Sequence, residues 1–268
     1  MRRVVGFILK PLTAPNLKGR IWKHWYRYFE RKIGDQPLRF MNYGLSPSGG
    51  PRLELEPADE PERLSIQLYH RVVSPISLSG ARVLEVSCGR GGGTDYAARY
   101  LRAGSVVGLD RTETALAFCR RTYSAPNLSF ICGDALALPL DENSVDVVVN
   151  VEASHCYPDL PRFLCEVRRV LRPGGHFLYA DFRRAAGLDT WIGQLAACGL
   201  SKTDEEDMTR GVVAALASSD AAKASLIRSV APRLLRNTFN QFAGTKNSII
   251  YRAFDNGNAR YMRFVFQK

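Results

Sequence analysis

A glycine-rich turn after a short apolar run constrains the fold of this chain more than any other feature. Residues 83–86 are mostly β-favouring and apolar, and Gly89 and the three glycines at 91–93 follow within a few positions. Such a run predicts a strand buried on both faces, and glycines let the backbone turn sharply and approach a ligand closely. Helix-favouring residues resume near Thr94. The segment therefore predicts a strand, a tight turn and a helix N-terminus, an arrangement that binds nucleotides.

Two classes of nucleotide compete for this turn. A dinucleotide site requires the pattern Gly-x-Gly-x-x-Gly, with a phosphate over the helix N-terminus. Counted from Gly89, the last glycine of that pattern falls on Thr94. In addition, Glu85 stands at the end of the strand, where a carboxylate suits a cation better than a pyrophosphate. S-adenosylmethionine (SAM) carries an ammonium and a sulfonium but no phosphate, so the turn favours SAM.

Strand and helix patterns alternate through the centre of the chain. Five runs have the character of strands, at 82–87, 105–110, 128–132, 145–150 and 176–181, and helical patterns separate them. This alternation predicts an α/β protein with a doubly wound, mostly parallel sheet. In such sheets, ligands bind outside the carboxyl ends of the strands.

Composition divides the chain into four segments. We expect residues 1–52 to form an N-terminal helical extension, with a helix at 17–33, and residues 53–182 to form the SAM-binding core. Residues 183–245 predict a helical substrate lid, with helices at 188–198, 204–217 and 221–242. Residues 246–268 hold two β-rich runs, 247–254 and 259–266, on either side of Asn256-Gly257. These runs predict an antiparallel β-hairpin that completes the core sheet.

The net charge of +11 is concentrated at the N-terminus. Residues 1–40 contain ten Lys and Arg residues but only two acidic residues, Glu30 and Asp35. A solvated helix face is the simplest interpretation. The alternatives are contact with an anionic membrane surface or with an acyl carrier. Nucleic acid is not an expected partner, because no recognisable nucleic-acid-binding module accompanies the charge.

Cysteine usage and apolar run lengths indicate the compartment. The six cysteines form no Cys-x-x-Cys pair and show no metal-ligand spacing with the four histidines. The longest apolar runs fall far short of the ~18 residues of a membrane span. We therefore expect a soluble, cytoplasmic protein without a bound metal. The oligomeric state stays open.

Polar residues at the predicted strand tips are the candidates for chemistry. Asp110 ends the second strand, 19 residues beyond Gly91, where a carboxylate can accept hydrogen bonds from both ribose hydroxyls. Asp134 follows the third strand, beside the expected position of adenine, and could accept from its exocyclic amine. His155 lies after the fourth strand and Asp181 at the tip of the fifth. The carboxylate could hold this imidazole in position as a general base.

Several motifs in order resemble the class I SAM-dependent methyltransferases. They are Glu85 with Gly89-x-Gly91, Asp110, Gly133-Asp134-Ala135, Asn150 and Leu171-Arg-Pro-Gly-Gly175. More narrowly, Leu84–Gly89, Val149–Pro158 and Gly175–Asp181 are similar to the mycobacterial phthiotriol dimycocerosate O-methyltransferase group, which is related to methyltransferases of polyketides, sugars and glycolipids. Ser87 replaces the usual first glycine of the loop, as it does in this narrower group. The resemblance implies a Rossmann-like, seven-stranded sheet that ends in an antiparallel hairpin, with helical lids.

The resemblance also implies roles for individual residues. SAM contacts are implied for Glu85, Cys88, Gly89, Gly91, Asp110, Arg111, Asp134, Ala135, Asn150 and Tyr43. Glu85 would bind the methionine ammonium, and Asn150 would lie near the sulfonium. Glu152, Tyr157 and Trp191 are the expected acceptor contacts, and His155 and Asp181 are the expected catalytic pair.

The predicted activity is methyl transfer from SAM to a hydroxyl of a lipid, polyketide or glycosylated natural product. The acceptor is therefore expected to be a small, apolar molecule, and S-adenosylhomocysteine the second product. A C- or N-methyltransferase of a similar molecule would use the same fold. A cyclase or a non-catalytic binding protein is the third alternative, because a fold does not by itself decide function.

Overall fold

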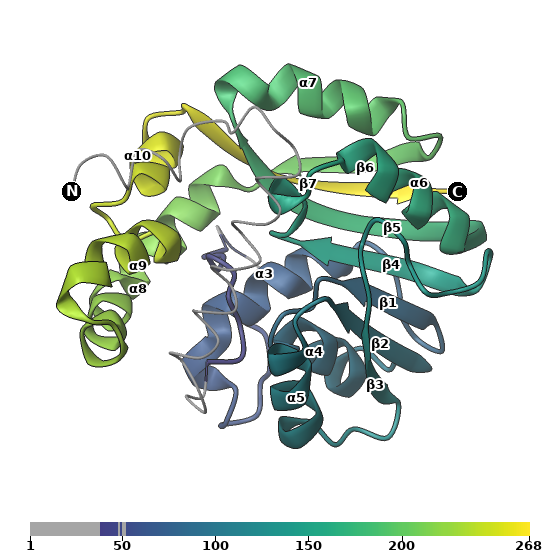
Figure 1. The fold of residues 1–268 in the computed structure, drawn as a ribbon, viewed down its shortest axis with the longest axis horizontal. Coiled ribbons are helices and arrows are strands. Elements are labelled where there is room, and N and C mark those ends of the chain that lie inside the picture. Colours follow the sequence, from purple (N-terminus) through teal and green to yellow (C-terminus); the bar gives the residue numbers. More distant parts are fainter. Residues whose placement is uncertain (1–37, 48, 50–51) are drawn as a thin grey trace.

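The computed structural model describes residues 38–47, 49 and 52–268. Helices lie on both sides of a central sheet (Figure 1). The predicted helix at 17–33 and nearly all of the basic N-terminal segment lie outside the described residues. Residues 38–47, which belong to the predicted N-terminal extension, form no helix or strand.

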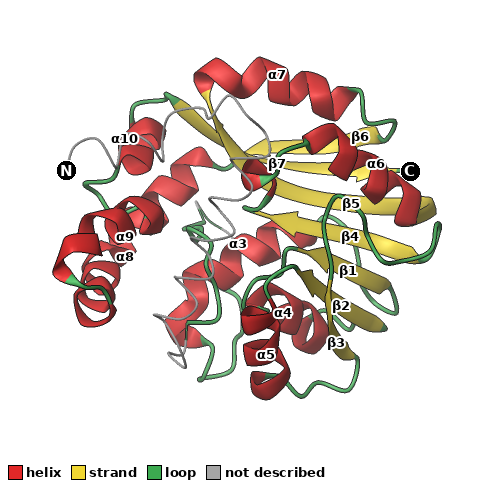
Figure 2. Ribbon diagram, viewed as in Figure 1, coloured by secondary structure: helices red, strands yellow, loops and turns green. Residues whose placement is uncertain are grey.

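The sheet has seven strands in the order β3-β2-β1-β4-β5-β7-β6. The strands are β1 (Arg82–Val86), β2 (Ser105–Asp110), β3 (Leu128–Cys132), β4 (Val145–Val151), β5 (Leu171–Arg184), β6 (Ser201–Asp207) and β7 (Ala259–Gln267). Strands β1 to β5 pair in parallel, and β7 is antiparallel to both β5 and β6. The predicted mostly parallel, seven-stranded class I methyltransferase fold is therefore confirmed (Figure 2).

The helices cover the two faces of the sheet because the inner strands are apolar on both sides. Along β4, Val147 and Val149 point into one core cluster and Val148 into the other, with the period of two that a strand imposes. The first cluster includes side chains of α3 (Arg63–Val73), α4 (Gly92–Tyr100), α8 (Thr209–Val230) and α10 (Ile249–Asp255). The second includes side chains of α6 (Leu160–Val170) and α7 (Ala185–Ala196). Helix α5 (Glu113–Thr122) contacts β2 and β3.

The antiparallel end of the sheet is present, but the predicted position of one of its strands was wrong. Residues 247–254, predicted to pair with β7, fall largely in helix α10, which Ser248 caps by accepting a hydrogen bond from the Tyr251 N–H at 3.0 Å. Asn256 and Gly257 end this helix, and Gly257 takes the left-handed φ of 79° common after helices. Hence the Asn-Gly pair is a helix terminus and not a hairpin turn.

The true outer partner of β7 is β6, in a stretch predicted to be partly helical. Its sequence, Ser-Lys-Thr-Asp-Glu-Glu-Asp, is charged and nearly all exposed, so it carries no apolar strand pattern. Its acidic residues instead pair with a buried arginine of β7, since Arg263 contacts Asp204 at 2.8 Å and Glu206 at 3.0 Å. Charged side chains are typical of edge strands, where they discourage pairing with other chains.

The segment 183–245, predicted as a helical lid, divides between the sheet and a separate layer. Helix α7 packs in the second core cluster and β6 joins the sheet. Helix α8, the short 3-10 turn η3 (Arg233–Leu235) and α9 (Arg236–Ala243) lie with α10 beyond the end of the sheet toward which the β4 arrow points (Figure 1). We call α8, α9 and α10 the lid. No helix in the described part of the chain combines the length and apolar character needed to cross a membrane.

Candidate active site

The glycine turn after β1 adopts a conformation that requires glycine. Gly89 and Gly91 have φ values of 54° and 75°, and Ser87 shares this left-handed region at 61°. A Cβ on Gly89 would lie 2.6 Å from the Met41 side chain, and one on Gly91 would lie 2.8 Å from the Tyr123 ring. The turn therefore forms a cradle of bare backbone at the carboxyl end of β1.

Asp110, at the tip of β2, holds this turn in place. Its carboxylate accepts hydrogen bonds from the N–H groups of Gly89 at 3.0 Å and Thr112 at 2.8 Å. Burial raises the pKa of Asp110, and these hydrogen bonds oppose the rise. Asp110 thus lies directly beside the cradle, and its contact with a ribose stays a prediction.

The other predicted contacts of the nucleotide lie around Asp110. Asp134 is exposed, and one of its oxygens accepts from the Leu136 N–H at 2.9 Å. Ala135 is buried and Arg111 is exposed. Cys88 is buried beneath the turn.

Glu85 is more enclosed than the sequence suggested. Its carboxylate accepts from the Tyr69 hydroxyl at 2.6 Å and from the Thr94 hydroxyl. Burial raises the pKa of Glu85 to about 7, and both hydroxyls oppose this rise. Glu85 therefore joins α3 and α4 to the tip of β1. Its contact with a methionine ammonium stays a prediction.

The tip of β4 presents an unsatisfied acceptor near the cradle. The Asn150 amide donates to the Val86 carbonyl at 2.9 Å and to the Tyr157 hydroxyl at 3.0 Å. Its carbonyl oxygen, Oδ1, is buried and has no hydrogen-bond partner among the described residues. The Tyr157 hydroxyl also lies 2.6 Å from that of Ser87. A buried orphan acceptor beside a glycine cradle fits a ligand that brings its own donor or positive charge.

The predicted catalytic pair is in direct contact. His155, in the 3-10 turn η2 (Ser154–Cys156), places Nδ1 2.8 Å from Asp181 Oδ1, and its backbone N–H donates to Oδ2 at 2.8 Å. Asp181 is fully buried and also accepts from the Ser154 hydroxyl, the Phe182 N–H and the Arg183 guanidinium. The carboxylate is therefore held from several directions and fixes the imidazole in turn.

Charges around the pair set its protonation. Burial alone would raise the pKa of Asp181, but Arg183 and His155 lower it far below its ordinary value. Burial alone would lower the pKa of His155, but Cys156 and Asp181 raise it to about 10. These charges favour an imidazolium next to a carboxylate.

An aromatic layer supports the pair from behind. The Phe182 ring lies 4.5 Å from the imidazole ring, centre to centre. Trp191, predicted as an acceptor contact, is 1% exposed and lies in the second core cluster. Its indole N–H donates to the Tyr179 hydroxyl at 3.0 Å, and that hydroxyl bonds to Ser154. The structure therefore places Trp191 one layer behind the pair and not on an open surface.

Glu152 and Tyr43 form the other wall of the site. The Glu152 carboxylate accepts from the Tyr43 N–H and the Tyr261 hydroxyl, both at 2.9 Å, and burial raises its pKa to about 7. The Tyr43 ring packs against Phe182 and against Phe254 of α10. Tyr43 thus joins the tip of β4 to the lid.

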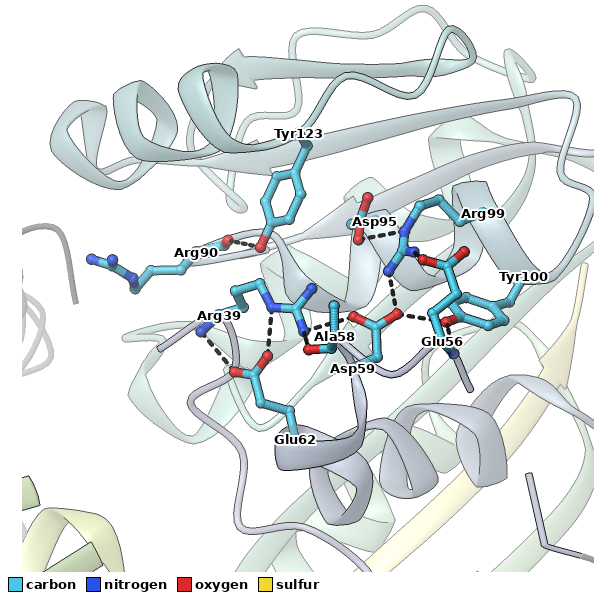
Figure 3. A network of polar contacts seen from close by, with 10 residues as sticks. All are labelled: Arg39, Glu56, Ala58, Asp59, Glu62, Arg90, Asp95, Arg99, Tyr100 and Tyr123. Carbon is cyan, nitrogen blue, oxygen red and sulfur yellow. Dashed lines mark hydrogen bonds and ion pairs between the residues drawn. The ribbon is translucent and has the colours of Figure 1, made fainter. Parts of the chain in front are cut away.

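A network of ion pairs, which the sequence did not reveal, anchors residues 38–47 over the cradle. Arg39 pairs with Asp59 at 2.7 Å and with Glu62, while Arg99 pairs with the other oxygen of Asp59 (Figure 3). The Arg39 carbonyl accepts from the Gly92 N–H at 3.3 Å. This clamp explains how Met41 and Tyr43 come to rest on the site from a segment without regular structure.

Comparison of the sequence with known proteins gives relatives along almost the whole chain. Residues 84–179 match the family model described as "Methyltransferase domain". The chain is 39% identical over 249 residues to the phthiotriol/phenolphthiotriol dimycocerosates methyltransferase of Mycobacterium leprae, covering 93% of this chain and 92% of that protein. It is 37% identical over 243 residues to the fatty-acid O-methyltransferase of Mycolicibacterium smegmatis, covering 91% and 88% respectively.

Solved structures with low sequence identity share the fold. The cyclase SpnF superposes with a TM-score of 0.71 at 18% identity, covering 93% of this chain and 94% of that one. The geranyl diphosphate C-methyltransferase from Streptomyces coelicolor superposes with a TM-score of 0.67 at 16% identity, covering 93% and 97%. At such identities the likeness concerns the fold alone, and these two neighbours differ in the chemistry named in their titles.

Proposed function

This chain belongs to the methyltransferase family that includes the mycobacterial phthiotriol/phenolphthiotriol dimycocerosates methyltransferases, and from that premise we propose that it methylates a hydroxyl oxygen of a lipid or polyketide-type acceptor. SAM is the methyl donor in this proposal. The observation that carries the proposal is the contact of His155 with Asp181 at the strand ends, beside the glycine cradle. The oxygen as target follows the relative that is named a fatty-acid O-methyltransferase.

The residues of the cradle fit a sulfonium nucleotide. Gly89 and Gly91 would let the backbone approach the cofactor, Asp110 would bind the ribose, and the exposed Asp134 would bind the adenine amine. The orphan oxygen of Asn150 suits a positively charged neighbour better than a phosphate. Bound SAM supplies an electrophilic methyl group, and the protein aligns it with the acceptor and excludes water.

His155 manages the proton of the acceptor. A hydroxyl is a poor nucleophile until a base removes its proton during attack. Because Asp181 binds the Nδ1 side of the imidazole, the Nε2 atom is the position that exchanges a proton with the acceptor. The positive charge of a bound sulfonium would disfavour a second cation nearby and so would lower the raised pKa of His155.

Transfer of a labelled methyl group tests the proposal. The protein is incubated with methyl-¹³C SAM and a mixed lipid extract, and the product is examined by NMR. An O–CH₃ resonance is the expected result. A C–CH₃ or N–CH₃ resonance would replace the hydroxyl acceptor by another nucleophile. Absence of label from every product, with SAM bound, would favour a cyclase or a non-catalytic binding protein.

A further inference from the structure

A buried cation on the lid has no role in the site described so far. The Nζ atom of Lys223, on α8, is buried, and no acceptor lies within hydrogen-bonding distance of it in the described part of the chain. Three buried residues of α8 lie on the same helical face as Lys223: Val212, Leu216 and Ile227. They stand eleven, seven and four residues from it, which are spacings of whole helical turns. Lys223 therefore points from α8 in the direction of packing and not toward solvent.

Two contacts on either side of Lys223 locate it over the active site. Toward the start of α8, Leu216 lies against Gly244, which in turn lies against the Tyr43 ring. The backbone N–H of Tyr43 donates a hydrogen bond to the Glu152 carboxylate. Toward the end of α8, Ile227 belongs to a cluster against which Met41 packs, and Met41 closes on Gly89 of the cradle. Lys223 thus lies on α8 between a turn that reaches Tyr43 and Glu152 and a turn that reaches Met41 and the cradle.

Charge is not balanced at this position. Among the charged groups, Glu152 raises the pKa of Lys223 the most, and Asp220, which lies one turn away on the same helix, raises it less. Asp220 accepts a hydrogen bond from the Lys246 N–H, and Glu152 accepts two others. Burial lowers the pKa of Lys223 to about 8 and raises the pKa of Glu152 to about 7. A buried ammonium without a hydrogen-bonded anion is costly unless a ligand supplies one.

We propose that Lys223 binds a carboxylate of the acceptor, so that the acceptor is a long-chain acid. This inference rests on the proposed function, which it narrows. A single ammonium among apolar side chains suits one carboxylate at the end of an apolar chain, whereas a phosphate usually recruits several donors. Lys223 would act in specificity, by holding the acid group next to Glu152 and Tyr43.

The inference leaves the reaction balanced. The hydroxyl oxygen of the acceptor forms the new C–O bond, the C–S bond of SAM breaks with its electrons going to sulfur, and the hydroxyl proton passes to His155. The carboxylate bound to Lys223 takes no part in these bonds.

Binding of dodecanoate and 1-dodecanol to the full-length protein, saturated with S-adenosylhomocysteine, tests the inference by calorimetry. Wild-type protein should bind dodecanoate at least tenfold more tightly than the alcohol. Lys223→Met should weaken dodecanoate binding at least tenfold and leave the alcohol unchanged. Lys246→Met removes an exposed lysine of the lid region and is the matched control, which should bind both ligands as wild type does. Equal binding of acid and alcohol by the wild type, or an equal loss of both in Lys223→Met, would refute the role of Lys223.

Two further measurements distinguish a loss of carboxylate binding from a loss of stability and from a failure of the proposed function. The melting temperature of Lys223→Met should not fall below that of wild type, because the substitution removes a buried charge without a partner. Should it fall, Lys223→Gln, which keeps a polar side chain, repeats the comparison. Label transfer from SAM to 12-hydroxydodecanoate, which carries both a carboxylate and a hydroxyl, is scored independently. Lys223-dependent binding of dodecanoate without any label transfer to 12-hydroxydodecanoate would overturn the proposed function and leave the inference standing. Label transfer with Lys223-independent binding of dodecanoate would do the reverse.

Discussion

At the scale of single residues, Asp181 organises the catalytic end of the site. It is fully buried, yet its carboxylate accepts hydrogen bonds from Ser154, His155 and Phe182 and pairs with Arg183 at 3.1 Å. A buried carboxylate with this many donors stays ionised. It can therefore stabilise an imidazolium that forms when His155 accepts a proton.

Replacement of the imidazole tests its role as base. His155→Gln should lower kcat by about 10²-fold or more, the usual contribution of a general base, while SAM affinity stays within a few-fold. Steady-state kinetics and calorimetry measure the two quantities. His176→Gln serves as the control, because His176 lies on β5 far along the strand from Asp181 and should leave kcat unchanged. Wild-type turnover in His155→Gln would remove His155 as the base.

The same imidazole links stability to pH. Its folded pKa of about 10 exceeds the ordinary value near ~6.5. The imidazolium therefore contributes stability in full below pH ~6.5, and this contribution disappears as the pH rises through about 10. The melting temperature of the wild type should exceed that of His155→Gln by more at pH 6 than at pH 10. Because burial lowers the pKa of His176, His176→Gln should not show this narrowing, and a constant gap for His155→Gln would contradict the raised pKa.

At the scale of elements, a segment without regular structure is held on the site by ion pairs. Asp59, which is 1% exposed, forms ion pairs with Arg39 and Arg99 and accepts a hydrogen bond from the Tyr100 hydroxyl (Figure 3). It therefore joins residues 38–47 to α3 and α4. Arg39 then places its carbonyl on the Gly92 N–H at the start of α4. The clamp thereby sets the position of Met41 and Tyr43 over the cradle.

Loss of the central carboxylate should loosen this clamp. Asp59→Ala leaves two partly buried guanidinium groups without their shared partner, and such losses cost about 3 kcal/mol of unfolding free energy. Chemical denaturation measures the loss. Arg52→Ala breaks only the exposed pair with Glu60 and should change stability by less than about 0.5 kcal/mol. Similar stability of the two variants would show that the clamp does not hold the segment.

Two elements, α10 and β6, have a conformation that their local sequence pattern does not favour. Ile249, Ile250 and Tyr251 are β-favouring residues, yet the Ser248 cap and the burial of Ala253 and Phe254 in the first core cluster make this stretch a helix. Strand β6 shows the reverse, since a charged sequence pairs along β7 through backbone hydrogen bonds and Arg263. Packing partners remote in sequence decided both cases, because intrinsic propensities are weaker than tertiary contacts.

At the scale of the whole molecule, the proposed cofactor site lies where several strands end. The cradle after β1, Asp110 of β2 and Asn150 of β4 come from different parts of the chain but share one edge of the sheet. Residues 38–47 and the lid lie against the same region through Met41 and Tyr43. A ligand bound there contacts several elements at once and should stabilise the fold as a unit.

Ligand-induced stabilisation tests this arrangement. S-adenosylhomocysteine at a hundred times its Kd should stabilise the wild type by about 2.7 kcal/mol, seen as a rise in melting temperature. Asp110→Asn should weaken binding by about 1–3 kcal/mol, the scale of an unsatisfied buried polar group, and so shrink that rise at the same ligand concentration. Asp141→Asn, an exposed residue outside the site, is the control. An unchanged rise in Asp110→Asn would refute the ribose assignment.

The sequence by itself determined that five strands, β1 to β5, alternate with helices in a parallel sheet, and it determined the glycine turn and the polar residues at the strand tips. These features depend on local periodicity and on glycine geometry, and the parallel strands then bring Asp110, His155 and Asp181 to one edge. Only the tertiary structure decided that β6 borders β7, that Trp191 is buried behind the pair, that Asp59 pairs with Arg39 and Arg99, and that the ammonium of Lys223 is buried. The physical reason is that burial and ion pairing depend on which surfaces meet, and no local pattern encodes that.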